Sequence, residues 1–420
     1  MKIPIRHSDS TRTLGRRATA AALGLTISGL WPALAGADDW VFPHSQAEAI
    51  KMEEANALPL TQFYDPPSLA GTKPGALLRH EPFDAYKLPA GATAVRILYH
   101  SLSFSGADVA ASGVVLLPSR KAPAGGWPVI VWAHGTTGVA RTCAPSLQKD
   151  VAYGEEGLFP MVRAGFAVIA PDYRGLGTPG PHEWLYKMAQ ARDVLYSVPA
   201  ARAAVPSLSR PYVVIGHSQG GMAAWGAAEL GTTLKDPDFR GAIAVAAGAD
   251  LKPLLEQLVS GPNAYYADYA AYAVHAQDPK FKAADMLMGH ALASYGDVTT
   301  KGCYNYIYGT FVNQHGAVVK AGWESTTPVR RYFDATVFGT APLGVPLLVL
   351  AGEGDTTVVL SQVKASVARA CASTLPIAFK AYPGLEHDPV MDKSTPDQLA
   401  WARDRLAGKP FASNCSDLKL

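Results

Sequence analysis

The stretch PYVVIGHSQGGMAAWG, residues 211–226, constrains this chain more than any other part of it. Its β-favouring run Tyr-Val-Val-Ile ends at a Gly-x-Ser-x-Gly pattern centred on Ser218, and small apolar residues follow. This is the order of a short buried strand, a sharp turn and a helix. Such a turn strains the backbone of the serine. It also needs glycine on both sides, because Cβ atoms at these positions would collide with the strand and the helix. The stretch therefore predicts a nucleophilic Ser218 on a sharp turn at the end of a strand.

Further β-type runs occur on both sides of this stretch, and helical segments separate several of them. One helix is expected over residues 184–204, just before the strand that leads to Ser218. Strands that alternate with helices predict a mostly parallel central sheet flanked by helices, an α/β class. The other expected strands cover residues 95–100, 112–117, 128–133, 166–171, 241–247, 345–351 and 377–382.

The alternation stops over residues 251–339, where helical segments rich in tyrosine replace the strands. We interpret this segment as a helical cap, or lid, inserted over the site. Its tyrosines either line an amphiphilic pocket or pack with hydrated hydroxyls. Residues 38–250 and 340–420 then form the core. Its first part, residues 38–90, is rich in proline and polar residues and has one helical patch at 47–57, which indicates an extension that wraps the core.

The N-terminus has the pattern of an export signal. Basic residues Arg12, Arg16 and Arg17 precede an apolar run of alanine and leucine, and small residues follow before Gly36. We therefore expect a cleaved signal over residues 1–37, with a retained membrane anchor as the alternative. The run is short for a bilayer span, and the paired arginines permit a twin-arginine route. The mature protein is expected to be secreted or periplasmic.

All four cysteines follow this signal, and an even number in an exported chain favours two disulfides, for which three pairings exist. They are Cys143, Cys303, Cys371 and Cys415. The sequence has no Cys-x-x-Cys unit, no His-Glu-x-x-His motif and no carboxylate cluster, which predicts no metal and no cofactor. The net charge of +2, with no basic run beyond the N-terminus, argues against a nucleic-acid partner.

A serine hydroxyl needs a histidine that takes its proton and a carboxylate that orients this histidine. In a chain that carries the serine turn described above, the expected order is serine, acid, histidine. His387 follows the last expected strand, and Glu353 and Asp355 follow the strand before it. Asp355 is preferred because it lies further past the strand end, in a Gly-x-Asp turn. We interpret His217 as packing within the serine turn.

The third expected strand leads directly into His134-Gly-Thr-Thr-Gly138. A glycine-bearing loop at this place can turn backbone N–H groups toward the negative charge that develops on an ester carbonyl oxygen. The alternative is an ordinary strand-to-helix turn with a capping threonine.

Taken together, these motifs resemble the secretory lipase family of the α/β-hydrolase superfamily, the type represented by yeast lipase A and its bacterial relatives. The resemblance covers most of the chain after the signal and implies an α/β-hydrolase fold with an inserted helical cap. It rests on HGTTGVARTCAPS at 134–146, PDYRGLGTPGPHEWL at 171–185, GHSQGG at 216–221, GEGDTTV at 352–358 and GLEHD at 384–388.

The resemblance also implies roles for single residues. Ser218, Asp355 and His387 match the family's triad. The oxyanion donors fall on Gln219 and on the loop that holds Thr136 and Thr137, of which we assign Thr137; the yeast type carries an acidic residue in this loop, unlike the present chain. The implied disulfides are Cys143–Cys303, which ties the cap to the segment after the oxyanion loop, and Cys371–Cys415.

The expected function is a secreted serine carboxylic-ester hydrolase, a lipase or carboxylesterase, that acts through an acyl-enzyme on Ser218. Its partner is a small-molecule or lipid ester, with transient contact to a lipid interface as a further option. A peptidase or a hydrolase of a specialised cell-wall or polyester substrate is the alternative on the same fold. A third alternative is a non-catalytic binding protein that keeps the fold. The presence of all three triad positions together with the loop at 134–138 argues against this alternative.

Overall fold

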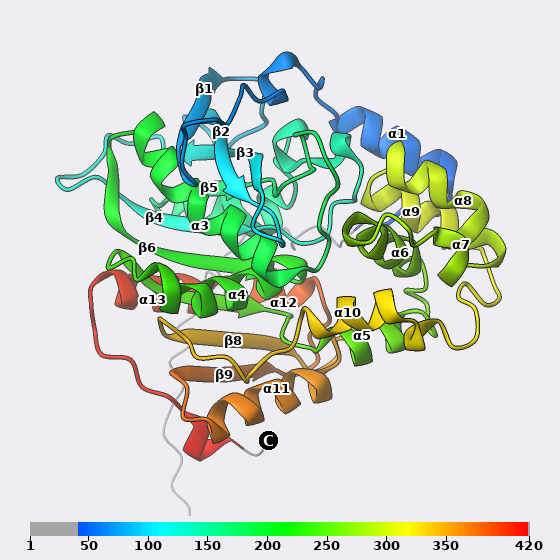
Figure 1. Ribbon diagram of the computed structural model, residues 1–420. Helices are drawn as coiled ribbons and strands as arrows, with labels where there is room; N and C mark the ends of the chain where they lie inside the picture. The colour runs from blue at the N-terminus through cyan, green and yellow to red at the C-terminus, as the bar shows by residue number, and fades with distance from the viewer. Residues whose placement is uncertain (1–40, 419–420) are drawn as a thin grey trace, which may run out of the picture. The chain divides into compact units, whose positions relative to one another are not determined.

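The chain between residues 41 and 418, which the computed structural model describes, is built around one nine-stranded sheet (Figure 1). The strand order is β1-β2-β3-β5-β4-β6-β7-β8-β9. The strands are β1 (Leu77–Phe83), β2 (Thr93–Leu102), β3 (Asp108–Leu117), β4 (Trp127–Ala133), β5 (Ala167–Pro171), β6 (Leu208–His217), β7 (Phe239–Val245), β8 (Leu347–Gly352) and β9 (Ile377–Tyr382). The predicted export signal, residues 1–37, lies outside the described residues.

The predicted α/β-hydrolase fold is confirmed. Strands β5, β4, β6, β7, β8 and β9 pair in parallel, and β1, β2 and β3 add an antiparallel edge. Strands β4, β5 and β8 consist almost wholly of buried apolar residues, as strands covered by helices on both faces must. Strand β1 was not predicted, because its sequence LLRHEPF shows no clear alternation and its residues were assigned to the extension.

The described part of the chain contains thirteen α-helices. Helices α3 and α4 pack on each other and on the central strands, and α3 begins at Lys187 rather than at the expected Trp184. The helices are α1 (Gln46–Asn56), α2 (Phe159–Arg163), α3 (Lys187–Ala204), α4 (Gln219–Leu234), α5 (Leu251–Leu258), α6 (Tyr266–Gln277), α7 (Ala283–Met286), α8 (Gly289–Thr300), α9 (Tyr304–Phe311), α10 (Thr327–Asp334), α11 (Leu360–Ala372), α12 (Pro389–Lys393) and α13 (Thr395–Leu406).

Several single turns of other helix types connect these elements. They are the 3-10 turns Gln62–Tyr64, Arg141–Cys143, Pro145–Leu147, Trp323–Ser325 and Cys415–Asp417, and the π-helical turn Gly154–Leu158.

Helices α5 to α10 occupy the connection between β7 and β8, and no strand of the sheet comes from this segment. In Figure 1 helices α6 to α9 gather on one side, beside α1. Helix α1 supports this group through Glu53, whose carboxylate accepts hydrogen bonds from the backbone N–H groups of Cys303 (3.0 Å) and Tyr306 (2.7 Å) at the start of α9. A carboxylate at a helix N-terminus satisfies free N–H groups and complements the helix dipole. The N-terminal extension thus caps a helix of the inserted segment.

Candidate active site

Ser218 lies at the tip of the turn between β6 and α4. Its φ of +56° and ψ of −120° are a strained conformation for a residue with a Cβ atom. A Cβ atom on Gly216 would lie 2.1 Å from the carbonyl oxygen of Gly220, and one on Gly220 would lie 1.9 Å from that of Ala133. Only glycine fits both positions, so the Gly-x-Ser-x-Gly pattern follows from the close approach of strand, turn and helix.

His387 lies between the serine and an aspartate. Its Nε2 atom is 2.9 Å from Ser218 Oγ, and its Nδ1 atom is 2.8 Å from Asp355 Oδ2. The three residues come from the loops after β6, β8 and β9, which end at the same edge of the parallel sheet. Of the two acids in the loop after β8, Asp355 contacts the histidine, whereas Glu353 is exposed. The structure thus brings together the three residues that the sequence pointed to.

The second oxygen of Asp355 fixes the orientation of the carboxylate. Oδ1 accepts hydrogen bonds from the backbone N–H groups of Thr357 and Val358, each at 2.8 Å. Burial by itself would raise the pKa of Asp355, but the charge and hydrogen bond of His387 and these two N–H groups outweigh it and lower the pKa. For His387, burial disfavours the charged ring, but the charge and hydrogen bond of Asp355 raise its pKa above the ordinary value. The pair favours an ionised Asp355 beside a basic His387.

His217 does more than pack within the turn. Its Nε2 atom is 2.9 Å from the carbonyl oxygen of His387, and its ring lies 4.9 Å from the His387 ring. Burial lowers the pKa of His217 to about 3, so the ring is neutral and Nε2 carries the proton that this contact needs. The residue before the serine therefore holds the loop that carries His387. No sequence pattern indicates this contact, because the two residues lie 170 positions apart.

The loop after β4 places Thr136 beside Ser218. Thr136 lines the same pocket as Ser218 and Gln219, and its Oγ1 donates a hydrogen bond to Gln219 Oε1 at 3.0 Å. Thr137, the residue assigned from the sequence, is buried, and its carbonyl oxygen accepts a hydrogen bond from the N–H of Tyr304 in α9. Thr137 does not line this pocket.

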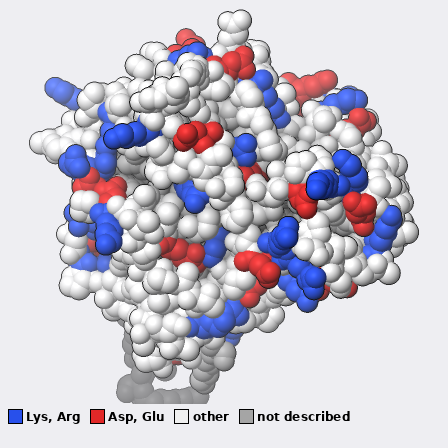
Figure 2. Space-filling model, viewed as in Figure 1, with Lys and Arg blue, Asp and Glu red and all other residues white. Residues whose placement is uncertain are grey.

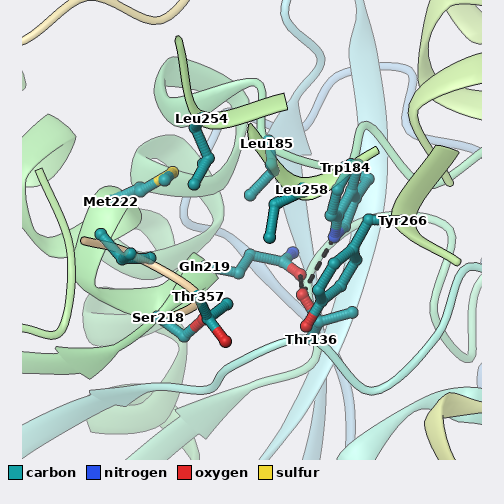
Figure 3. Close-up of a pocket in the computed structure, with 11 residues that line it drawn as sticks. Thr136, Trp184, Leu185, Ser218, Gln219, Met222, Leu254, Leu258, Tyr266 and Thr357 are labelled. Carbon is teal, nitrogen blue, oxygen red and sulfur yellow. Dashed lines mark hydrogen bonds between the residues drawn. The ribbon is translucent and has the colours of Figure 1, made fainter. Parts of the chain in front are cut away.

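The pocket above Ser218 has an apolar wall (Figure 3). Helix α5 contributes Leu254 and Leu258, which are one helical turn apart, and α4 contributes Met222. The described residues that line it carry no formal charge at neutral pH. Its volume is about 20 Å³, which is small for a ligand pocket. The full lining is Thr136, Trp184, Leu185, Ser218, Gln219, Met222, Leu254, Leu258, Tyr266, Thr357 and Val358.

Two disulfides are present, Cys143–Cys303 and Cys371–Cys415, the pairing that the resemblance implied. The first joins Cys143, which follows the loop after β4, to Cys303, the residue before α9. The loop residue Gly138, with φ +132°, lies against it: a Cβ atom there would be 2.7 Å from Cys143 Sγ. The disulfide and the hydrogen bond from Tyr304 to Thr137 hold the loop on the inserted helices.

The sequence of residues 146–414 matches the profile of a family described as Secretory lipase. The chain belongs to this family. A protein of Mycobacterium tuberculosis named "Probable inactive lipase" is 25% identical to this chain over 376 residues, which cover 84% of the present chain and 83% of that protein.

Solved structures share the fold of this secretory lipase family member. Candida antarctica lipase A in its closed state superposes with a TM-score of 0.70 at 17% identity, over 85% of this chain and 89% of that one. The rice cell wall degrading esterase LipA of Xanthomonas oryzae gives a TM-score of 0.65 at 18% identity, over 80% of this chain and 99% of that one. Family and fold support an ester hydrolase of the lipase or esterase type. Together with the two disulfides, the family also indicates an extracellular protein. Within residues 41–418, none of the helices has the length and apolar character of a membrane span.

Proposed function

We propose that this chain is an exported serine hydrolase of carboxylic esters, with Ser218 as nucleophile, His387 as general base and Asp355 as the acid that orients it. The observation that carries the proposal is the position of His387, within 2.9 Å of Ser218 Oγ and 2.8 Å of Asp355. The mycobacterial relative is named a probable inactive lipase. In the present chain, the hydrogen-bonding contacts of hydroxyl, imidazole and carboxylate support an active enzyme.

The geometry supports a two-step reaction. Ser218 Oγ attacks the ester carbonyl carbon while His387 Nε2 takes the hydroxyl proton, and Asp355 stabilises the imidazolium that forms. His387 then gives this proton to the departing alcohol, which leaves an acyl group on Ser218. Water attacks the acyl-enzyme with the same proton transfers, and the products are a carboxylic acid and the free serine.

The oxyanion that forms in each step needs donors near Ser218. We propose the backbone N–H of Gln219, at the N-terminus of α4, as one donor. The second donor is proposed to come from the loop after β4. Within this loop we propose Thr136 in place of Thr137, because Thr136 lines the pocket with Ser218 and Gln219.

The pocket lining supports an uncharged, apolar acyl group as substrate. Ligand pockets usually measure about 300–1,000 Å³, whereas this one measures about 20 Å³. Residues 251–339 therefore act in this proposal as a mobile cap whose first helix, α5, moves away from Ser218 when an ester binds. Figure 2 shows positive and negative side chains interspersed on the visible face, which is not the single-sign surface that a nucleic-acid partner would favour.

Labelling with a fluorophosphonate probe and hydrolysis of p-nitrophenyl butyrate test the proposal. The wild-type protein should be labelled once per chain and hydrolyse the ester. Ser218→Ala should lose labelling and nearly all hydrolysis, because the attacking atom is gone. Ser119→Ala, at an exposed serine, is the matched control and should behave as wild type. A Ser218→Ala protein that keeps a tenth of the activity would overturn the assignment. Sequencing the N-terminus of the exported protein tests cleavage of the proposed signal.

A further inference from the structure

Side-chain hydrogen bonds beside the pocket join the loop after β5, the loop after β4 and the start of α4, which follows β6. Strands β5, β4 and β6 are neighbours in the sheet. The loop after β5 carries His182 and Trp184, the loop after β4 carries Thr136, and Gln219 follows β6 and Ser218. Figure 3 shows Trp184, Thr136 and Gln219 converging, with hydrogen bonds between them.

The direction of each hydrogen bond in this network is fixed. The indole N–H of Trp184 can only donate, and it donates to Thr136 Oγ1 at 3.0 Å. The hydroxyl proton of Thr136 then goes to Gln219 Oε1, also at 3.0 Å. Gln219 therefore presents its amide N–H to His182 Nε2, 2.9 Å away.

His182 ends the network. Its Nδ1 atom is 3.0 Å from the carbonyl oxygen of Arg174, which can only accept, so the proton is on Nδ1 and Nε2 is free to accept from Gln219. Burial lowers the pKa of His182 to about 3, which agrees with a neutral ring. Its neighbour Glu183 forms an ion pair with Arg174 at 3.1 Å, which fixes the loop locally.

The network joins the two residues that supply the proposed oxyanion donors. The single contact between Thr136 and Gln219 sets the distance between the loop after β4 and the start of α4, and His182 and Trp184 hold its two ends. Donors for a developing oxyanion act because they are held in place before the reaction, so a small displacement reduces their effect.

We propose that His182 and Trp184 are positioning residues, which keep the two oxyanion donors at the correct separation through Thr136 and the side chain of Gln219. They do not touch the reacting atoms through these hydrogen bonds. The inference rests on the proposed function of Ser218. A network with this role should affect the rate of the chemical step and leave substrate binding nearly unchanged.

Paired substitutions test this role on the full-length protein. Thr136→Val keeps the shape and removes the hydroxyl, and His182→Leu removes both ring nitrogens. Each should lower kcat for p-nitrophenyl butyrate about 10-fold to 100-fold, less than the loss of a whole oxyanion donor, with KM changed less than about twofold. Thr136→Ser and His182→Gln keep a donor and an acceptor at these places and should recover kcat to within about threefold of wild type. Trp184→Phe removes the indole N–H and should also lower kcat, but KM is no criterion for this variant because Trp184 lines the pocket. His315→Leu, at an exposed histidine, should change neither kcat nor KM.

The outcomes separate this inference from the proposed function. If the wild type neither reacts with a fluorophosphonate nor hydrolyses the ester, both are overturned. If the wild type is active and Thr136→Val and His182→Leu keep its kcat, only the positioning role fails. A fall in kcat that comes with an equal rise in KM and a lowered Tm, without recovery in Thr136→Ser or His182→Gln, also overturns it, because that is the behaviour of a purely structural contact. Loss of kcat alone, with recovery in the conservative variants, is the expected result.

Discussion

Replacement of Asp355 by asparagine should invert the proton pattern of His387. Asp355 Oδ1 accepts two backbone N–H bonds, at 2.8 Å each, from Thr357 and Val358. In Asp355→Asn the side-chain oxygen keeps these two bonds, so the amide NH₂ must face His387 Nδ1. A donor at that place forces the proton of the neutral ring onto Nε2, the atom that faces Ser218. His387 then cannot accept the serine proton.

The expected loss follows from this wrong tautomer. A change of this kind costs about 10,000-fold in kcat, or about 5.5 kcal/mol of transition-state stabilisation. The pH dependence should change as well. Because Asp355 raises the pKa of His387 above its ordinary 6.5, wild-type activity should be lost as the pH falls through a midpoint above 6.5. In Asp355→Asn the midpoint of the residual activity should move to lower pH.

The assay is hydrolysis of p-nitrophenyl butyrate between pH 5 and 10, with circular dichroism to check folding. Glu353→Gln is the matched control, since Glu353 lies two residues away and is exposed. This control should keep the wild-type rate and midpoint. The reasoning is refuted if folded Asp355→Asn stays within tenfold of wild type, or if Glu353→Gln is the more damaging change.

Two further predictions concern the helices of the inserted segment. Leu258→Ala removes part of the pocket wall, so the ratio of activity on octanoate esters to activity on acetate esters should rise about tenfold. Leu292→Ala, at an exposed leucine, is the control and should leave this ratio unchanged. An unchanged ratio in Leu258→Ala would show that Leu258 does not determine the preferred acyl length. Asp268 is fully buried in α6, has one hydrogen bond, from Ser294 at 3.5 Å, and burial raises its pKa. Because the folded state disfavours the charged carboxylate, the free energy of unfolding falls as the pH rises above the ordinary pKa of 3.8. Asp268→Asn should therefore raise the free energy of unfolding by about 1–3 kcal/mol at pH 8 and by less at pH 4. Urea unfolding at the two pH values measures this difference.

Local sequence determined the parts of the site that depend on a few neighbouring residues. The strand-turn-helix order around Ser218 could be predicted from the sequence, because contacts within the turn and with Ala133 of β4 require its glycines. Asp355 and His387 were readable because each follows a buried strand, and parallel strands that alternate with helices end at one edge of the sheet. The inserted segment was readable because the strand pattern stops there.

Only the tertiary structure decided the features that depend on distant partners. Strand β1 exists because LLRHEPF pairs with β2, and its own pattern does not require a strand. We propose Thr136 instead of Thr137 as the residue of the second oxyanion donor, and this choice depends on how the loop after β4 lies. Its Thr136 side chain contacts Gln219, and its Thr137 carbonyl oxygen contacts α9. The link between His182 and Gln219 spans 37 positions and that between His217 and His387 spans 170. A hydrogen bond made by a side chain leaves no periodicity in the sequence, because it needs only one donor and one acceptor at one distance. The packing of the whole sheet sets that distance.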